Sequence, residues 1–340
     1  MELRLDRRNI VVIGTSAGGV QTLRDLFGLL PHDLPAAVLV VQHTPPYAPS
    51  KLHEIIARTT GLHVSPAVDG SALQAGTVHV AVADRHLMVE NGVIRLTRGP
   101  KESRARPSVD VLFRSAAAWF GDRVIGAVLT GALDDGTAGL WAIKDRGGLA
   151  FVQEPAEADF SSMPESAIQH VDVDFVGPVA ALAGKIAASV SEEYEPAATI
   201  GGKWRMEREN QISASGKGIE NGVMDLGPVS KYTCPDCHGV LVQINEGSIV
   251  RFRCHTGHAF SMKTLIAGVN AAIDIGLWDT LRAVEERIML LRHMAATAEG
   301  TGNLEEAGRC RTQADEAERR LNPIRELVLD PDFFGHDPNS

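Results

Sequence analysis

The first 190 residues of the chain predict an α/β domain with a doubly wound, mostly parallel sheet. Short apolar runs alternate with helix-length segments, and several runs are apolar at nearly every position, as in strands covered on both faces. In such sheets the ligand site lies at the carboxyl ends of the strands. The predicted strands are residues 10–14, 36–42, 77–82, 92–97, 123–131, 149–153 and 173–177. The predicted helices include residues 18–30, 50–60, 108–119 and 178–190.

The remaining 150 residues divide into three parts. Residues 191–230 are polar and glycine-rich with no sustained period, which predicts a flexible linker. Residues 231–261 form a compact Cys/His segment of zinc-ribbon type. In residues 262–340, apolar side chains recur at helical spacing on both sides of "EGTGN", which predicts a helical hairpin and a tail. Cys310 falls on the apolar stripe and is expected in the hairpin core.

Composition excludes several classes of protein. The 340 residues exceed one average domain, and the formal net charge of -10 argues against nucleic acid or anionic lipid as a partner. No run approaches the roughly 18 apolar residues of a membrane span. The first residues enter a strand without a signal-peptide layout, so we expect a cytoplasmic protein with no membrane insertion. No cysteine precedes Cys234, which argues against a disulfide framework in the first part.

Ser16 lies in "GTSAGG", directly after the first predicted strand. The spacing G-x-S-x-G lets a serine occupy a sharp strand-to-helix turn with its hydroxyl exposed. The helix that begins near Gly18 would direct its N–H groups to the same point. Two other interpretations remain open at this stage: a glycine-rich nucleotide-binding turn, and a serine that only caps the helix.

His43 and an aspartate are predicted at the same edge of the sheet. The second strand ends in "VVQHTPP" and a later one is followed by "ALDDGTAG", which carries Asp134 and Asp135. A serine nucleophile needs an adjacent base, and that base needs a carboxylate to orient it. A nucleotide site would require an acidic residue where Gln42 and His43 stand, so the pattern favours the nucleophile. Read alone, His43 suits a surface loop and "LDDGTAG" a capped helix start.

Five motifs in order, "GTSAGG", "VQHTPP", "RPSVDVLF", "LTGALDDGTAGL" and "MPESAI", resemble the catalytic domain of the CheB-type chemotaxis receptor methylesterases. The resemblance covers about residues 9 to 190. It implies hydrolysis of γ-glutamyl methyl esters on the cytoplasmic helices of chemoreceptors, releasing methanol without a catalytic cofactor. The nucleophile, base and aspartate of the family fall on Ser16, His43 and Asp135.

The resemblance also suggests residues around the triad. Backbone N–H groups of Gly18, Gly131 and Ala132 are candidates for holding the oxyanion. His86 and Arg106 are candidates for lining the substrate site. Further expected neighbours of the site are Arg104, Ser108 and Asp110. The alternative is that Ser108 and Asp110 merely begin a helix.

The sequence departs from the family at two points. The family loop "LTGMG-x-DG" reads "LTGALDDG" here, so Leu133 replaces a glycine. A leucine adopts positive φ only at a cost, and we expect the loop and its oxyanion geometry to differ. The matching motifs begin near residue 10, which leaves no room before them for a receiver domain. We therefore expect no control by aspartyl phosphorylation within this chain.

The Cys/His segment predicts a structural zinc site. Cys234-x2-Cys237 and Cys254-x3-His258 flank a predicted hairpin, as in a zinc ribbon. Four protein ligands leave no open position for catalysis. His238 and His255 are alternative ligands, each adjacent to a ligand cysteine. The competing interpretation is three reduced thiols in a small apolar cluster.

Three functions fit these observations. The first is a methylesterase acting on chemoreceptor-like proteins. The second is an esterase or glutamine deamidase acting on another protein. The third is a weakly active signalling adaptor, which the altered "GALDDG" loop favours. We expect the C-terminal module to dock a regulator or receptor, or to shield the active site.

Overall fold

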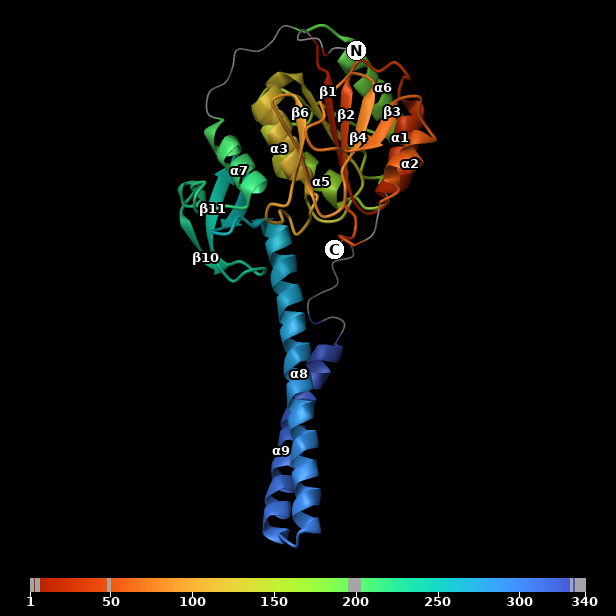
Figure 1. Ribbon diagram of the computed structural model, residues 1–340. Helices are drawn as coiled ribbons and strands as arrows, with labels where there is room; N and C mark the ends of the chain where they lie inside the picture. Colours follow the sequence, from red (N-terminus) through yellow and green to blue (C-terminus); the bar gives the residue numbers. More distant parts are fainter. Residues whose placement is uncertain (1–2, 4–6, 48–49, 195–202, 331–332, 334–340) are drawn as a thin grey trace. The chain divides into compact units, whose positions relative to one another are not determined.

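The computed structural model describes residues 3, 7–47, 50–194, 203–330 and 333, grouped in two compact units, one ending at Leu265 and one beginning at Ile266. In the first unit, seven strands form a parallel sheet in the order β3-β4-β2-β1-β7-β8-β9 (Figure 1). These strands are β1 (Ile10–Thr15), β2 (Ala37–Gln42), β3 (His63–Pro66), β4 (Thr77–Val80), β7 (Val124–Val128), β8 (Leu149–Gln153) and β9 (Phe175–Gly177). The doubly wound parallel sheet is confirmed.

Helices cover both faces of this sheet. One layer contains α1 (Gly19–Leu29), α2 (Leu52–Ala57) and α6 (Val179–Ser191); the other contains α3 (Val109–Phe120), α4 (Thr137–Asp145) and α5 (Ser162–His170). Strand β1 shows why its sequence is apolar throughout. Val11 and Ile13 pack in the first layer, and Ile10 and Val12 pack in the second.

Strand β1 lies between β2 and β7, and this arrangement positions the site. Thr15 pairs with Gln42 of β2, and Gly14 pairs with Val128 of β7. The loops that follow these three parallel strands therefore leave the same edge of the sheet side by side.

Three strands in the first 190 residues differ from the sequence prediction, and one of them, β5 (His86–Glu90), was not predicted as a strand. Residues 92–97 do not join the central sheet, because β6 (Val93–Thr97) pairs antiparallel with β5 in a separate hairpin. Strand β3 was also not predicted. It lies at the sheet edge with its side chains partly exposed, so its sequence has no apolar run.

The prediction of a flexible linker over 191–230 is wrong for residues 203–230. This stretch contains helix α7 (Trp204–Ser215), a 3-10 helix (Val223–Asp225) and strand β10 (Val229–Thr233). Polar side chains of α7, Glu209 and Asn210, are buried against charged partners, whereas their polarity suggests solvent exposure. Residues 195–202 of the predicted linker lie outside the described residues.

The Cys/His segment forms a small antiparallel sheet within the first unit. Its strands are β10, β11 (Val240–Glu246), β12 (Ile249–Cys254) and β13 (Ala259–Ser261). Leu241, Phe252 and Phe260 form its apolar core together with the cysteines.

The second unit is the predicted helical hairpin. Helices α8 (Met262–Gly300) and α9 (Leu304–Leu329) pack through an apolar seam. Cys310 lies buried on α9, as expected. Residues 331–332 and 334–340 of the predicted tail lie outside the described residues. None of the helices in the described chain combines the length and the hydropathy of a membrane span.

Candidate functional site

Ser16, His43 and Asp135 meet at the carboxyl edge of the sheet. Ser16 follows β1, His43 follows β2, and Asp135 lies between β7 and α4. The Ser16 Oγ is 3.1 Å from the His43 Nδ1, and the His43 Nε2 is 2.8 Å from the Asp135 Oδ2. Because an ionised carboxylate only accepts hydrogen bonds, Nε2 carries the ring proton and Nδ1 is left to accept from the serine hydroxyl. The structure thus brings the three predicted residues together in hydrogen-bonded order.

Asp135 is held by the first turn of α3. Its carboxylate accepts hydrogen bonds from the Ser108 Oγ (2.9 Å), the Val109 N–H (2.7 Å) and the Asp110 N–H (3.1 Å). Donors at a helix N-terminus stabilise a negative charge. Ser108 and Asp110 therefore lie behind Asp135 and support it.

Asp110 is a second buried carboxyl beside Asp135. Its Oδ1 accepts from the N–H groups of Gly136 (3.0 Å) and Gly139 (2.6 Å), which ties α3 to the start of α4. Burial, followed by the charge of Asp135, raises the pKa of Asp110 well above its ordinary value. Two adjacent buried carboxyls disfavour double ionisation, and at Asp110 this disfavours the charged form.

The backbone around Ser16 is tightly fixed. The Ser16 N–H donates to the Thr130 carbonyl (3.0 Å), and the Gln42 Nε2 donates to the Ser16 carbonyl (2.7 Å). Gly131 packs directly on Ser16, because a Cβ there would lie 2.9 Å from the Ser16 Cβ and 2.1 Å from the Met163 Sδ. The sequence did not predict that Gln42 holds the backbone of Ser16. Its position at the end of the second strand, next to His43, was the only indication of this role.

The predicted oxyanion donors divide into two groups. The Gly131 N–H donates to the Phe160 carbonyl (2.9 Å), so the prediction that it holds the oxyanion is wrong. The N–H groups of Gly18 and Ala132 donate to no other residue in the described part of the chain. Gly18 adopts φ +76° at the start of α1, a conformation that suits glycine. The Ala17 N–H, which the sequence analysis missed, is equally free of a partner among the described residues.

His86 is fully buried and does not line the substrate site, so this prediction is wrong. Its Nε2–H donates to the Pro100 carbonyl (2.9 Å), and its Nδ1 accepts from the Ser108 N–H (3.3 Å). Burial lowers the pKa of His86, which keeps the ring neutral. The imidazole ring thus links Pro100 to Ser108, the two ends of the loop before α3, and Ser108 is one of the donors to Asp135.

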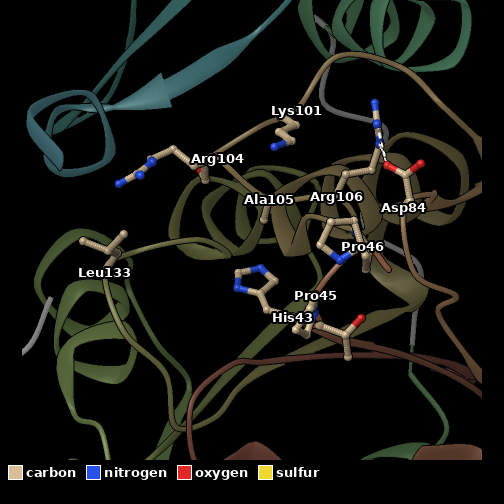
Figure 2. A pocket seen from close by; sticks show the side chains of 12 residues that line it. His43, Pro45, Pro46, Asp84, Lys101, Arg104, Ala105, Arg106 and Leu133 are labelled. Carbon is tan, nitrogen blue, oxygen red and sulfur yellow. Dashed lines mark hydrogen bonds and ion pairs between the residues drawn. The ribbon is translucent and has the colours of Figure 1, made fainter. Parts of the chain in front are cut away.

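A cleft of about 430 Å³ opens at His43. Figure 2 shows the imidazole facing the segment from Lys101 to Arg106, with Leu133 at one side and Asp84 at the other. Arg106 lines this cleft as predicted, and its guanidinium pairs with Asp84 and donates to the Gly99 carbonyl (2.7 Å). Hydrogen bonds from Arg106 lower the pKa of Asp84 and keep this pair charged.

Two cations of the cleft carry no such partner. Lys101 and Arg104 are exposed and form no ion pair with any residue that the structure describes. With Arg106 neutralised by Asp84, they give the cleft a net positive charge.

The "GALDDG" loop keeps a conformation suited to glycine at Leu133, which has φ +63°. The leucine therefore accepts the backbone strain expected from the sequence. The next residue, Asp134, is buried, and burial raises its pKa to about 6 despite a hydrogen bond from the Ser261 Oγ (2.7 Å). Ser261 lies 127 residues further along the chain, and no sequence signal indicated this contact.

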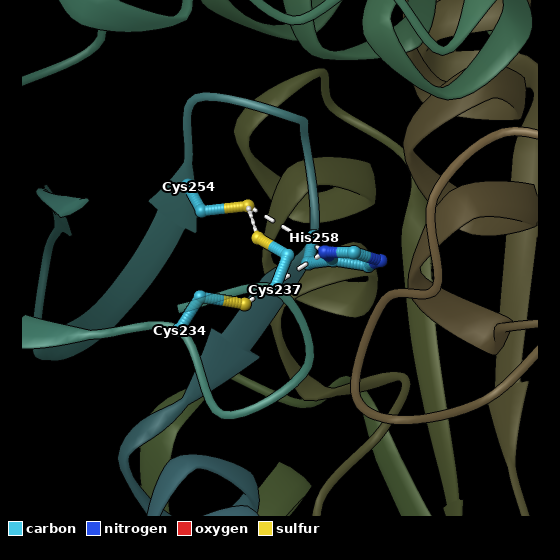
Figure 3. A group of neighbouring side chains, drawn as sticks. All are labelled: Cys234, Cys237, Cys254 and His258. Carbon is cyan, nitrogen blue, oxygen red and sulfur yellow. Dashed lines mark hydrogen bonds between the residues drawn. The ribbon is translucent and has the colours of Figure 1, made fainter. Parts of the chain in front are cut away.

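Cys234, Cys237, Cys254 and His258 form one cluster (Figure 3), with ligand atoms all within 4.8 Å of one another. The Cys237 and Cys254 sulfurs are 3.6 Å apart, and the His258 Nδ1 is 3.7 Å from Cys234 Sγ. Ligands at about 2.0–2.3 Å from a tetrahedral zinc ion lie about 3.5–3.8 Å apart, so this donor set fits zinc. The alternative ligands His238 and His255 are not among the four clustered residues.

The fold and the hydrogen-bonded serine, histidine and aspartate define an α/β protein built like a serine hydrolase. The family model for CheB methylesterase matches residues 11–186, and the chain belongs to this family. The crystal structure of the Thermotoga maritima CheB methylesterase catalytic domain superimposes with a TM-score of 0.51 and 33% identity, covering 53% of this chain and 97% of that one.

Two curated relatives carry the name protein-glutamate methylesterase/protein-glutamine glutaminase. The protein from Methanosarcina mazei is 39% identical over 187 residues, or 53% of this chain and 51% of its own length. The putative enzyme from Leptospira interrogans is 35% identical over 167 residues, or 49% of this chain and 86% of its own length. The chain thus matches about half of the length of the Methanosarcina relative.

Proposed function

We propose that this protein hydrolyses γ-glutamyl methyl esters on chemoreceptor-type proteins, with Ser16 as nucleophile. The observation that supports this most directly is the hydrogen-bonded order Ser16–His43–Asp135 at the sheet edge. A serine hydroxyl becomes a nucleophile when an oriented base removes its proton as it attacks.

The reaction follows from the contacts of these three residues. The Ser16 Oγ attacks the ester carbonyl while the His43 Nδ1 takes its proton, and Asp135 stabilises the resulting imidazolium. His43 then protonates the departing methoxide, and methanol leaves an acyl-serine. Water, activated by His43, cleaves this intermediate and releases the glutamate. The free N–H groups of Gly18 and Ala132 are our candidates for the oxyanion donors, typically about 3 kcal/mol each.

The charge of the cleft supports an acidic protein as substrate. Lys101 and Arg104 would face carboxylates that neighbour the esterified glutamate on a receptor helix. We propose that the reaction takes place in the cytoplasm, where the methylated helices of such receptors lie.

Glutamine deamidation is a second candidate activity. The curated relatives are named for both reactions, and the same acyl-serine chemistry would release ammonia in place of methanol. The adaptor alternative loses support, because Leu133 retains the left-handed conformation and Asp135 keeps its contact with His43.

We propose that Cys234, Cys237, Cys254 and His258 hold a structural zinc ion. The distances within the cluster support this, and so does the small apolar core beside it, which is too small to hold the segment alone. Four protein ligands leave no position for a catalytic water. Exposed apolar side chains on α8, including Ile273 and Trp278, support the expectation that a regulator docks on the helical hairpin.

The test is methanol release from a methylated chemoreceptor cytoplasmic fragment. We expect Ser16→Ala to lower kcat by about 10⁴-fold or more while the protein stays folded. Ser191→Ala, which changes an exposed serine at the end of α6, is the matched control and should keep the wild-type rate. Turnover retained in Ser16→Ala would rule out the nucleophile, and ammonia release from a glutamine substrate would identify the second activity.

A further inference from the structure

Strand β13 contacts the loop that lines the cleft. It begins at Ala259, the residue after the cluster member His258. The Ser103 N–H donates to the Ala259 carbonyl (2.8 Å), and the Ala259 N–H donates to the Lys101 carbonyl (3.1 Å). Residues 101–103 are thus paired with the Cys/His segment through both the N–H and the carbonyl of Ala259.

The same strand contacts the loop that carries the catalytic carboxylate. The Ser261 Oγ donates to the Asp134 Oδ1 (2.7 Å), and the Ser261 Oγ also accepts from the Thr264 N–H (3.0 Å). Asp134 is buried and directly precedes Asp135. A change at Ser261 therefore reaches Asp135 through one peptide unit.

Both loops contain strained backbone. Six non-glycine residues have positive φ in the described chain, and three of them are Ser103, Arg104 and Leu133. Such conformations persist only where surrounding contacts hold them. Strand β13 contacts Ser103 itself and Asp134, the residue after Leu133, so its loss would remove contacts from both loops.

A buried ion network lies beneath these contacts. Glu102, in the cleft loop, pairs with Arg114 of α3 (2.9 Å) and with Arg253 of β12 (2.8 Å). Arg253 also pairs with Glu209 of α7 (3.0 Å), and all four side chains are at most 3% exposed. Buried ion pairs therefore join the Cys/His segment to α3, to α7 and to the cleft loop.

We propose that the Cys/His segment is part of the catalytic framework, with Ser261 as a positioning residue for Asp135 and with metal at the cluster holding β13 against both loops. This inference rests on the proposed function. It extends that function by making the activity of Ser16 depend on a metal site that takes no part in the chemistry.

The two loops predict different kinetic effects. Ser261 acts through Asp134 on the orientation of the triad, so its loss lowers kcat. Lys101 and Arg104 contact the substrate, so displacement of their loop raises KM. Metal removal affects both loops and therefore changes both constants.

The first experiment compares serine variants in the full chain loaded with Zn²⁺. We expect Ser261→Ala to lower kcat for methanol release at least tenfold with KM within threefold, and Ser261→Thr, which keeps the hydroxyl, to stay within threefold of wild type. The matched control is Ser248→Ala, which removes a contact of the same segment with His170 on α5 and should change kcat less than twofold. A fall in kcat of less than threefold in Ser261→Ala overturns the proposal.

The second experiment measures amide hydrogen exchange before and after chelation, and again after Zn²⁺ is restored. We expect faster exchange in residues 101–106 and 132–135 of the metal-free protein, with β1 unchanged, and recovery with Zn²⁺. Faster exchange confined to residues 234–258 overturns the proposal. This readout does not depend on activity. If wild type neither releases methanol nor reacts with a serine-directed phosphonate, the proposed function fails, while the exchange result still decides this inference.

Discussion

Replacing Arg253 with methionine removes one positive charge from a fully buried network. The Arg253 Nη2 lies 2.8 Å from the Glu102 Oε1 and 3.0 Å from the Glu209 Oε1, and its Nη1 donates to the Gly257 carbonyl (2.9 Å). Both carboxylates would keep another arginine, Arg114 for Glu102 and Arg251 for Glu209. Breaking a buried pair typically costs 3–5 kcal/mol, so we expect the lower end, about 3 kcal/mol.

This loss should appear as one cooperative shift. At about 2–4 °C per kcal/mol for a unit of this size, Tm should fall by about 6–12 °C in calorimetry. The matched control is Arg309→Met, which breaks exposed ion pairs on α9 and should leave the transition of the first unit unchanged. A shift below about 2 °C, or separate melting of the α/β domain and the Cys/His sheet in wild type, would refute the reasoning.

The dependence of stability on pH between pH 2 and 5 gives an independent test of the Arg253→Met change. Arg114 and Arg253 outweigh the burial of Glu102 and lower its pKa to about 2, from 4.5. A depressed folded pKa contributes stability above the unfolded pKa, and that stability is lost as pH falls toward 2. Without Arg253 the folded pKa of Glu102 lies closer to 4.5, so the loss of stability should be smaller and should end at a higher pH in urea unfolding measured between pH 2 and 5.

Three further predictions concern the cleft and its loops. Leu133→Gly removes left-handed strain of about 1 kcal/mol, offset by lost apolar contact, so methanol release should stay within about threefold of wild type; a loss beyond tenfold would assign the side chain a substrate contact. Lys101→Glu should raise KM several-fold and weaken its salt dependence, and unchanged KM at low salt would argue against an acidic substrate. Asp134→Asn should stabilise the protein by roughly 2–3 kcal/mol at pH 7, because the folded pKa of about 6 exceeds the unfolded value of 3.8 and the stability of the wild type falls as pH rises between these values. In urea titrations the gain should vanish below about pH 4. An equal gain at pH 4 and pH 7 would contradict the raised pKa of Asp134.

The sequence was sufficient for the triad because its members follow apolar strands. Once the strands are parallel, Ser16, His43 and Asp135 must leave one edge, and only the strand order remained to be found. The same logic failed for Gly131, since its N–H is satisfied by a carbonyl from a distant loop. A hydrogen bond between two backbone groups does not depend on the side chains, so the sequence does not indicate it.

The contacts of the C-terminal part were beyond sequence reasoning for a different reason. Glu209 is polar and lies in a polar stretch, so its pattern indicates solvent, whereas pairing with Arg251 and Arg253 makes its burial possible. Ser261 is one of many serines, and its hydrogen bond to Asp134 depends on how two different sheets of the first unit pack together. The local secondary-structure propensity of the sequence indicates neither the burial of Glu209 nor the contact of Ser261.

The separation of 127 residues between Asp134 and Ser261 also orders events during synthesis of the chain. At about 5–20 residues per second, roughly 6–25 s pass between translation of these two residues. During that interval the nascent chain already contains Ser16, His43 and Asp135, while strand β13, which contacts the loop of Asp135, has not been made. A ribosome-bound intermediate would then contain all three residues of the triad before the contacts of β13 have formed. On the proposal above, full reactivity would be acquired only after the Cys/His sheet has emerged and folded.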